Sequence, residues 1–385
     1  MTYKLSAKAV LLAALVPFAA IAEDGVSPDK VVFGQVAAFE GPASALGIGM
    51  RTGIEAAFAE VNSAGGVHGR TLDLITKDDG YEPDRSIAGV QEMVSSGGVF
   101  GLIGPVGTPT SKATQPIATD AGIPFIGPFT GAGFLRDAAL QNVINVRATY
   151  AAETEAWINY LVDVRGMKNI AILYQDDGFG RVGLAGVTAA LEKRGMNLVA
   201  EGTYTRNTTA VKSALLTIRK AEPEAVVMVG SYKPVAEFIK LSRRLKFDPT
   251  FVNISFVGSS ALTAELGADG AGVIVSQVVP FPWDSSIPVV AQYHAALKAS
   301  NPDAEPGFVS LEGYIVGRLA IAALEKAGNE PTRSAFLAAV QSMSAHDLGG
   351  VVLGYGPGDN QGMEDVFMTQ ITTDGTFAPL EVPGS

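Results

Sequence analysis

Short β-branched segments alternate with amphipathic stretches of helical length along most of this chain, and that alternation limits the fold more than any other feature. Residues 31–38 (VVFGQVAA) have the composition of a strand, and residues 49–66 carry apolar side chains at helical spacing. Strands that alternate with crossover helices are typical of parallel sheets covered on both faces. The rhythm starts again near residue 150, with the apolar run 169–175. We therefore predict an α/β protein with two similar lobes.

Two later segments carry local signals of their own. Residues 349–379 contain turn sequences at Pro357–Asn360 and Asp374–Gly375, which predict hairpin-like strands near the end of the chain. Residues 207–221 have an apolar stripe at helical spacing, and Asn207–Thr208 predicts a capped start for that helix.

The first 22 residues have the pattern of a secretion signal. Lys4 and Lys8 precede an apolar run, and Ala20–Ala22 fits the small-residue rule for cleavage after Ala22. A membrane anchor is the less favoured reading, because a span needs ~20 apolar residues. The chain has no cysteine, so it has no disulfide framework, no thiolate metal site and no thiol that could carry a lipid. A secreted protein without a lipid anchor is expected in the periplasm.

The formal net charge is −11 and becomes −13 once Lys4 and Lys8 leave with the signal. A surface of this sign repels nucleic acid and anionic membrane, so neither is an expected partner.

The motifs for catalysis and cofactor binding are incomplete. Gly101, Gly104 and Gly107 lie in a glycine-rich turn, but Lys112 is not preceded by the glycine that a phosphate loop requires. The three histidines lie far apart, and no nucleophile elbow occurs. Asp176–Asp177 could act as a general acid and base, although paired aspartates more often close a turn. We therefore expect no catalytic residue, no metal and no cofactor.

Ligands of open parallel sheets bind beyond the carboxyl ends of the strands. These ends combine hydroxyl groups, aromatic rings and flexible backbone, which suits a small polar ligand. The residues at the predicted strand ends are Phe39, Glu40, Thr108, Phe129, Thr130, Gly131, Asp176, Phe179, Tyr232, Ser255 and Phe256.

Several ordered segments resemble the type I periplasmic solute-binding proteins, in the leucine/isoleucine/valine-binding branch. They are EVNSAGGVHGRTLDLITKDDGYEPDRSI, GLIGPVGTPTS, DAGIPFIGPFTGAGFL and FVSLEGYIVGRLAIAAL, and the likeness covers nearly all of the mature chain. The resemblance implies two Rossmann-like lobes joined by a three-stranded hinge, with the chain crossing near 147–150, 277–281 and 349–353. The implied N-terminal lobe is 24–148 with 280–350, and the C-terminal lobe is 149–279 with 351–385.

The family also implies a function without catalysis. Ligand is held between the lobes by hinge closure, and the closed monomer docks on the inner-membrane permease of an ABC transporter. By resemblance, the Thr108 hydroxyl grips the ligand's carboxylate, and backbone amides and a carbonyl of Phe129–Gly131 hold the carboxylate and the ammonium. The positive end of a helix starting near Pro109 would also point at an anion. Phe179 and Tyr232 shield the ligand.

One position departs from the pattern of amino-acid-binding relatives. Ser255 stands where those relatives place an acid that pairs the ligand's ammonium, and a buried ammonium without a counter-ion is costly. Either Glu40, Asp176 or Asp177 supplies the charge, or the ligand lacks an ammonium. Phe39, Phe129, Phe179, Tyr232 and Phe256 would make the cleft aromatic.

Three functions remain open on these grounds. The chain could be a receptor for the uptake of an amino acid or related small carboxylate or amide. It could also be a secreted α/β enzyme that uses Asp176 or Asp177 on a small carboxylate, or a sensor that passes its ligand state to a signalling partner.

Overall fold

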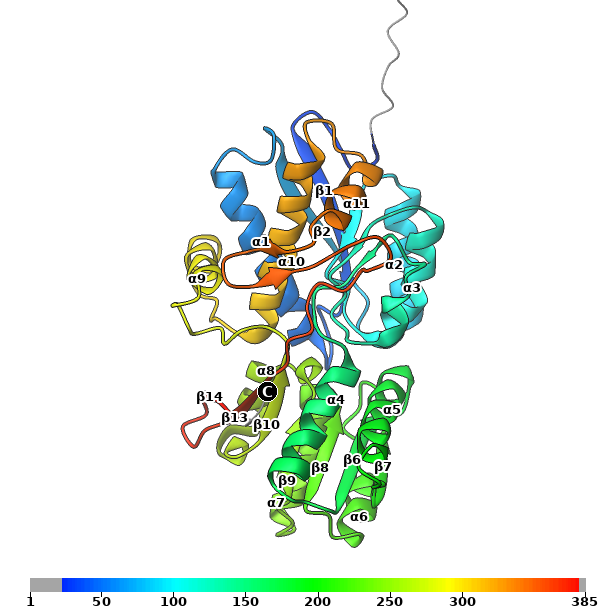
Figure 1. The fold of residues 1–385 in the computed structure, drawn as a ribbon, viewed down its shortest axis with the longest axis vertical. Helices are drawn as coiled ribbons and strands as arrows, with labels where there is room; N and C mark the ends of the chain where they lie inside the picture. Colours follow the sequence, from blue (N-terminus) through cyan, green and yellow to red (C-terminus); the bar gives the residue numbers. More distant parts are fainter. Residues whose placement is uncertain (1–22, 381–385) are drawn as a thin grey trace, which may run out of the picture.

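The computed structural model describes residues 23–380, which form two α/β lobes placed end to end (Figure 1). The proposed signal peptide, with its cleavage after Ala22, lies outside the described residues, as do residues 381–385. No helix within residues 23–380 is both long enough and apolar enough to cross a bilayer.

The first lobe is built on a five-stranded parallel sheet in the order β2-β1-β3-β4-β5. Its strands are β1 (Lys30–Ala37), β2 (Thr71–Asp78), β3 (Gly101–Ile103), β4 (Phe125–Ile126) and β5 (Val143–Ile144). Its helices are α1 (Ser44–Ser63), α2 (Pro83–Ser95), α3 (Thr108–Asp120), α9 (Pro288–Ser300), α10 (Phe308–Ala327) and α11 (Arg333–Gln341), with a 3₁₀ turn at Gly133–Arg136.

Glycines bring α1 and α10 unusually close together in this lobe. A Cβ atom at Gly53 would lie 1.9 Å from the Ser310 carbonyl oxygen, and one at Gly313 would lie 2.3 Å from the Met50 carbonyl oxygen. Only glycine permits such an approach of two backbones. This contact holds α10 against the first lobe, although α10 lies more than 150 residues after the strands of that lobe in the sequence.

The second lobe is built on a seven-stranded sheet in the order β14-β13-β10-β9-β8-β6-β7. Its parallel strands are β6 (Ile170–Gln175), β7 (Ala200–Tyr204), β8 (Ala225–Val229), β9 (Thr250–Asn253) and β10 (Ile274–Gln277). Its helices are α4 (Tyr150–Ile158), α5 (Gly178–Glu192), α6 (Lys212–Lys220), α7 (Tyr232–Arg244) and α8 (Ser259–Leu266), with a π-helical turn at Asn159–Val164 and 3₁₀ turns at Ser255–Val257 and Gly267–Gly270.

The last strands confirm the predicted hairpin. β13 (Phe367–Ile371) pairs antiparallel with both β10 and β14 (Phe377–Pro379), and the turn between β13 and β14 contains Asp374–Gly375. The parallel α/β prediction for both lobes is confirmed as well.

The predicted start of the helix at 207–221 is wrong. Helix α6 begins at Lys212, and no side chain caps it. Asn207 has a positive φ of 59°, and its side-chain nitrogen donates to the Gly80 carbonyl and to Glu82 in the first lobe. Asn207, which the sequence predicts to cap the helix, instead forms hydrogen bonds between the two lobes.

The chain stays with the first lobe beyond the expected third crossing. A short antiparallel pair, β11 (His346–Asp347) and β12 (Val352–Leu353), is followed by Asn360, whose carbonyl accepts from the Asn145 amide, and by Gly362, whose amide donates to the Asn145 carbonyl. Figure 1 shows this orange segment lying across the upper lobe. The lobe limits remain a proposal, and these bonds favour a third crossing at about 362–366 rather than 349–353.

Candidate functional site

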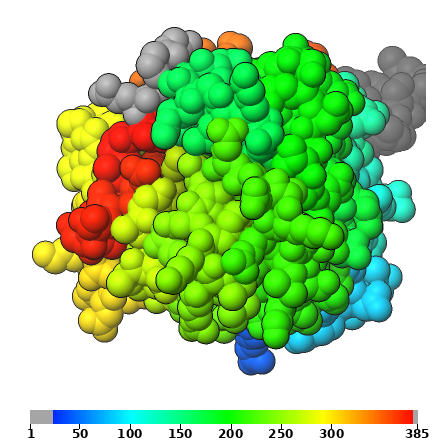
Figure 2. All heavy atoms as spheres, turned by 90° about the horizontal axis from the view of Figure 1, so that it is seen from below, coloured from blue at the N-terminus to red at the C-terminus, as the bar shows by residue number. Residues whose placement is uncertain are grey.

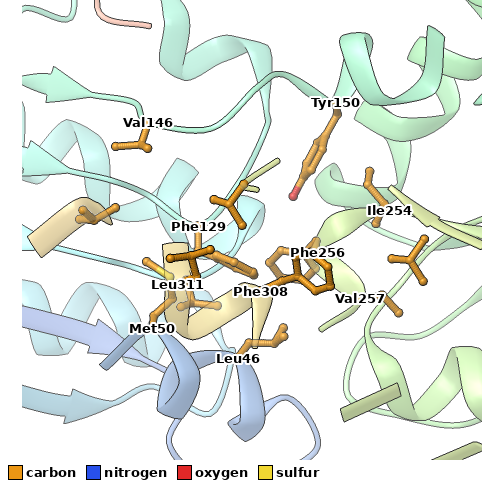
Figure 3. Close-up of a cluster of buried hydrophobic side chains, with 14 of the residues drawn as sticks. Leu46, Met50, Phe129, Val146, Tyr150, Ile254, Phe256, Val257, Phe308 and Leu311 are labelled. Atoms are coloured by element: carbon orange, nitrogen blue, oxygen red, sulfur yellow. The ribbon is translucent and has the colours of Figure 1, made fainter. Parts of the chain in front are cut away.

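The carboxyl ends of both sheets face each other where the lobes meet, and the site is built there. Figure 3 shows Phe129 from the first lobe and Phe256 from the second side by side, with the Tyr150 hydroxyl pointing toward them. All three side chains are buried in this closed arrangement. The interior of the cleft is therefore shielded from solvent.

The loop after β3 presents a hydroxyl at the start of helix α3. Gly107 has a φ of 105°, and a Cβ atom there would lie 2.3 Å from the Tyr81 ring, so the turn requires glycine. Thr108 follows as the first helical residue, and its Oγ1 lies 2.7 Å from Oγ1 of Thr130, which follows β4. Both threonines are fully buried. The positive end of the α3 dipole and two hydroxyls thus meet inside the cleft.

The Tyr150 hydroxyl extends this group of donors. Burial raises the pKa of Tyr150, against the influence of Arg147 and the Thr130 and Thr108 hydroxyls close by. Its oxygen has no hydrogen-bond partner among the described residues, and leaving a buried hydroxyl unpaired carries a cost. An acceptor placed between Tyr150 and the two threonines would remove that cost.

Arg147 forms a buried ion pair at the same place. Its Nε lies 2.9 Å from Oε1 of Glu312 on α10, and its Nη2 donates to Oε2 at 3.0 Å. Burial alone would lower the pKa of Arg147, but the Glu312 carboxylate reverses the direction and raises it. The guanidinium lies 4.3 Å from the Phe129 ring centre, and its Nη1 has no partner among the described residues.

A second buried acid, Glu153 on α4, lies directly against Ser255. The Ser255 amide and hydroxyl donate to its carboxylate at 2.9 and 2.8 Å, and the Ser276 hydroxyl donates at 2.5 Å. Burial raises the pKa of Glu153, while Arg147 and these donors oppose the shift. A buried carboxylate on α4 thus lies next to the position at which the sequence has Ser255.

Aromatic rings from both lobes fill the space between these polar groups. Phe256 lies 4.6 Å from Phe179, 5.5 Å from Phe129 and 5.8 Å from Tyr81, measured between ring centres. Tyr150 lies 5.5 Å from Phe179. Of the rings expected in the cleft, the structure brings Phe129, Phe179 and Phe256 together, and it adds Tyr81 and Tyr150.

Other expected residues lie outside this group. Phe39 is only partly buried and lies beneath the Arg51 guanidinium, 4.8 Å away. Glu40 is exposed, and its amide donates to Asp78. Tyr232 is buried at the contact between lobes, where its hydroxyl accepts from the Ala45 amide at 3.4 Å.

The backbone of Gly131 is tied to the hinge. Its carbonyl accepts from the Tyr150 amide at 2.8 Å, and a Cβ atom at Gly131 would lie 2.6 Å from the Tyr150 ring. This contact positions Tyr150 at the start of α4.

The paired aspartates have structural contacts at the rim. Asp177 accepts from the Phe179 amide at the start of α5 and pairs with Arg206 at 3.0 Å, whereas Asp176 pairs with the exposed Arg181. Arg206 also reaches Glu82 of the first lobe at 2.6 Å, and Asn207 donates to the same carboxylate. We call Arg206, Asn207 and Glu82 the rim latch, because they join the lobes.

Among the residues that sequence reasoning missed, those of α4 had a detectable signal. The buried residues Tyr150, Glu153, Thr154 and Trp157 are spaced on one face of this helix. An acid on the same helix face as large aromatic side chains indicates a buried carboxylate with a specific partner. Arg147 had no such signal, because it lies outside any helical stripe.

Two parallel-sheet lobes that meet over a shielded cleft define a two-lobed solute-binding protein with the type I periplasmic binding protein fold. The chain belongs to the periplasmic binding protein family, since the model of that family matches residues 30–376.

Known relatives place it in the leucine/isoleucine/valine-binding branch. It is 24% identical to Leu/Ile/Val-binding protein homolog 7 of Brucella abortus (strain 2308), over 85% of this chain and 84% of the relative. It is 23% identical to the Leu/Ile/Val-binding protein of Escherichia coli (strain K12), over 71% and 74%. The family and these relatives are binding proteins, so the enzyme alternative is set aside.

A solved structure supports the same assignment. The crystal structure of a possible leucine/isoleucine/valine-binding protein from Rhodopirellula baltica SH 1 matches with a TM-score of 0.87 and 38% identity, over 94% of this chain and 98% of that one. A fatty acid ABC transporter substrate-binding protein from Thermomonospora curvata shares the fold, with a TM-score of 0.84 at 20% identity.

Proposed function

We propose that this chain is the periplasmic receptor of an ABC importer and captures a small carboxylate, most simply an amino acid or a related acid or amide. The lobes close over one solute, and the closed monomer delivers it to the inner-membrane permease. The observation that carries the proposal is the Tyr150 hydroxyl, which is buried beside Thr108 and Thr130 and has no hydrogen-bond partner within residues 23–380.

The chemistry of these groups favours an anionic ligand. Hydroxyls and a helix N-terminus bind a carboxylate strongly once water is excluded. Arg147 adds positive charge nearby, although Glu312 already neutralises most of it. Neutral donors can therefore hold the anion, and the Arg147 guanidinium lies close by, 4.3 Å from the Phe129 ring centre.

Glu153 extends the proposal to an amine. Its two oxygens accept three hydrogen bonds and retain room for one further donor. A ligand ammonium placed there would stabilise the ionised carboxylate, whose pKa burial raises. We propose that Glu153 replaces the acid that relatives carry at the position of Ser255.

A thermal-shift screen over amino acids, amides, ureas, aromatic acids and short carboxylates tests the class of ligand. A solute present at ~100 times its Kd adds ~2.7 kcal/mol to the free energy of unfolding. Calorimetry then compares the best α-amino acid with the same acid lacking its amine. Tighter binding of the amino acid supports the role of Glu153, and equal binding would contradict it.

Thr108→Val removes the hydroxyl with little change of shape. We expect it to weaken carboxylate binding by ~1–3 kcal/mol, because a buried charge loses a hydrogen bond. Thr52→Val is the matched control, since the Thr52 hydroxyl bonds only to the Ile48 carbonyl on α1. Equal affinities for the two variants would remove Thr108 from the site.

A further inference from the structure

A second cavity lies away from the cleft, on the side of the hinge. It has a volume of about 820 Å³, within the range of small-molecule sites. Four segments line it: α8, the stretch containing Phe281 and Trp283 after β10, Glu305–Pro306 before α10, and the 373–377 turn between β13 and β14. Figure 2 shows the C-terminal strands (red) beside the 280–300 region (yellow) on this face.

The wall of this cavity is aromatic. The Trp283 and Phe377 rings are nearly parallel, with centres 5.9 Å apart and an angle of 11° between them. Phe281 and Phe308 pack edge-on against Trp283 at 5.0 and 5.6 Å. Trp283 nevertheless remains 40% exposed, which is unusual for so large an apolar side chain. Trp283 lines the cavity, and part of its surface is therefore available to a ligand.

The charged residues at this cavity are acidic. Glu305 and Asp374 line it, and no lysine or arginine does so among the residues that the structure describes. The hydroxyls of Thr372 and Thr376 hold the pKa of Asp374 below its usual range, so it is ionised at neutral pH. Ser260, Thr263 and Thr376 add hydroxyls.

We propose that this hinge-side cavity is a second binding site, for a small organic cation with an aromatic or aliphatic body. The indole face of Trp283 attracts a cation through its π electrons, and Glu305 and Asp374 supply complementary charge. The rings bury the apolar part of the ligand. An anion would meet two carboxylates without a compensating base on the lining.

The position of the cavity links it to lobe closure. Glu305 precedes α10, which packs on α1 of the first lobe, whereas α8 and the 373–377 turn belong to the second. A cation that bound the open and closed forms with different affinities would, by linkage, change the affinity of the cleft for its own ligand, and the reverse would hold by the same factor.

Calorimetry with benzyltrimethylammonium tests the site, with benzyl alcohol and phenylmethanesulfonate as neutral and anionic probes. We expect one cation to bind per chain, and to bind at least about fivefold more tightly than either other probe. Anion binding of equal strength would overturn the proposed ligand class, and the absence of saturable cation binding would overturn the site.

Two sets of variants locate the binding. Trp283→Leu keeps an apolar side chain but removes the indole ring, and we expect it to weaken cation binding about tenfold. The double change Glu305→Gln and Asp374→Asn should weaken the cation about threefold, leave benzyl alcohol unchanged and preserve thermal unfolding. Unchanged cation affinity in both variants would overturn the proposal.

The cleft variant Thr108→Val separates this site from the proposed function. We expect it to bind benzyltrimethylammonium as wild type does. Loss of cation binding in Thr108→Val would place the cation in the cleft and overturn the second site. Loss of only the carboxylate ligand would leave the second site supported.

Discussion

The interior of the cleft and its rim each contain an arginine–glutamate ion pair, and the two pairs differ in their exposure to solvent. Inside, Arg147 and Glu312 form an ion pair whose side chains are 1% and 3% exposed. At the rim, Arg206 and Glu82 form a pair whose side chains are 22% and 42% exposed. The interior pair lies away from water, whereas solvent screens the rim pair.

The difference in exposure assigns the two pairs to different tasks. Breaking a buried pair leaves an uncompensated charge, which costs far more than the net worth of the pair. An exposed pair contributes little to stability, but this one joins the two lobes. We therefore expect the interior pair to support the fold around the site and the rim latch to affect how long the cleft stays closed.

The largest expected effect comes from breaking the interior pair. Glu312→Gln leaves Arg147 buried without its counter-ion, and we expect the free energy of unfolding to fall by ~3–5 kcal/mol. Urea denaturation measures this change. Arg147→Met combined with Glu312→Leu removes both charges and should recover most of the loss. A single variant that loses less than ~1 kcal/mol would show that the pair is well hydrated.

The adjacent carboxylates of Asp78 and Asp79 also differ in burial, and their pKa values shift in opposite directions. Asp79 is fully buried, and burial raises its pKa from the usual 3.8 to about 6. For Asp78, burial is outweighed by the Phe39, Glu40 and Gly80 amides, which lower its pKa. Folding thus favours the protonated form of Asp79 and the ionised form of Asp78.

The signs of the two pH dependences follow from these shifts. The contribution of Asp79 is complete below pH 3.8 and is lost as the pH rises past about 6. Relative to Asp79→Asn, wild type should therefore lose ~1–3 kcal/mol of stability between those values. Relative to Asp78→Asn, wild type should gain stability as the pH rises to 3.8 and should keep that gain above it, because the pKa of Asp78 in the folded protein lies below 3.8. Urea titrations from below pH 3.8 to above pH 6 measure both dependences, and equal signs would contradict the account.

The rim latch should affect kinetics more than stability. Arg206→Gln is expected to change the free energy of unfolding by less than ~1 kcal/mol, because the pair is partly exposed. It should raise the rate of ligand release about threefold to tenfold, and salt should alter that rate less than in wild type. Stopped-flow fluorescence measures the rate.

Arg181→Gln is the control for the latch. Its partner Asp176 lies in the same lobe, and both side chains are about half exposed. Release rates that change equally in the two variants would contradict the role of the latch.

Sequence alone predicted the repeated α/β pattern, the hairpin and the threonine loop, because each depends on local periodicity or turn residues. It did not predict Arg147, Glu153 or the position of Asn207. Glu153 reaches Ser255 across 102 residues, and Asn207 reaches Glu82 across 125. Such contacts depend on the tertiary arrangement of the lobes, which the spacing of residues along the chain does not determine.

The positions of Phe39 and Glu40, which lie outside the group of buried rings, show the same limit. The sequence predicts which residues follow the strands, at the edge of the sheet. It does not predict the direction of each side chain, which determines whether the residue reaches the interior of the cleft. Phe256 and Phe129 point inward, whereas Glu40 points to solvent.

Tyr150→Phe offers the most direct measurement of the central claim, that the Tyr150 hydroxyl, together with Thr108 and Thr130, holds a carboxylate in the closed cleft. Calorimetry should show about tenfold weaker binding of the best carboxylate ligand, equivalent to the loss of one hydrogen bond to a charge. Because the Tyr150 hydroxyl has no partner among the described residues, the free energy of unfolding without ligand should stay unchanged or rise slightly. Unchanged ligand affinity, or a loss of stability without ligand, would contradict the account.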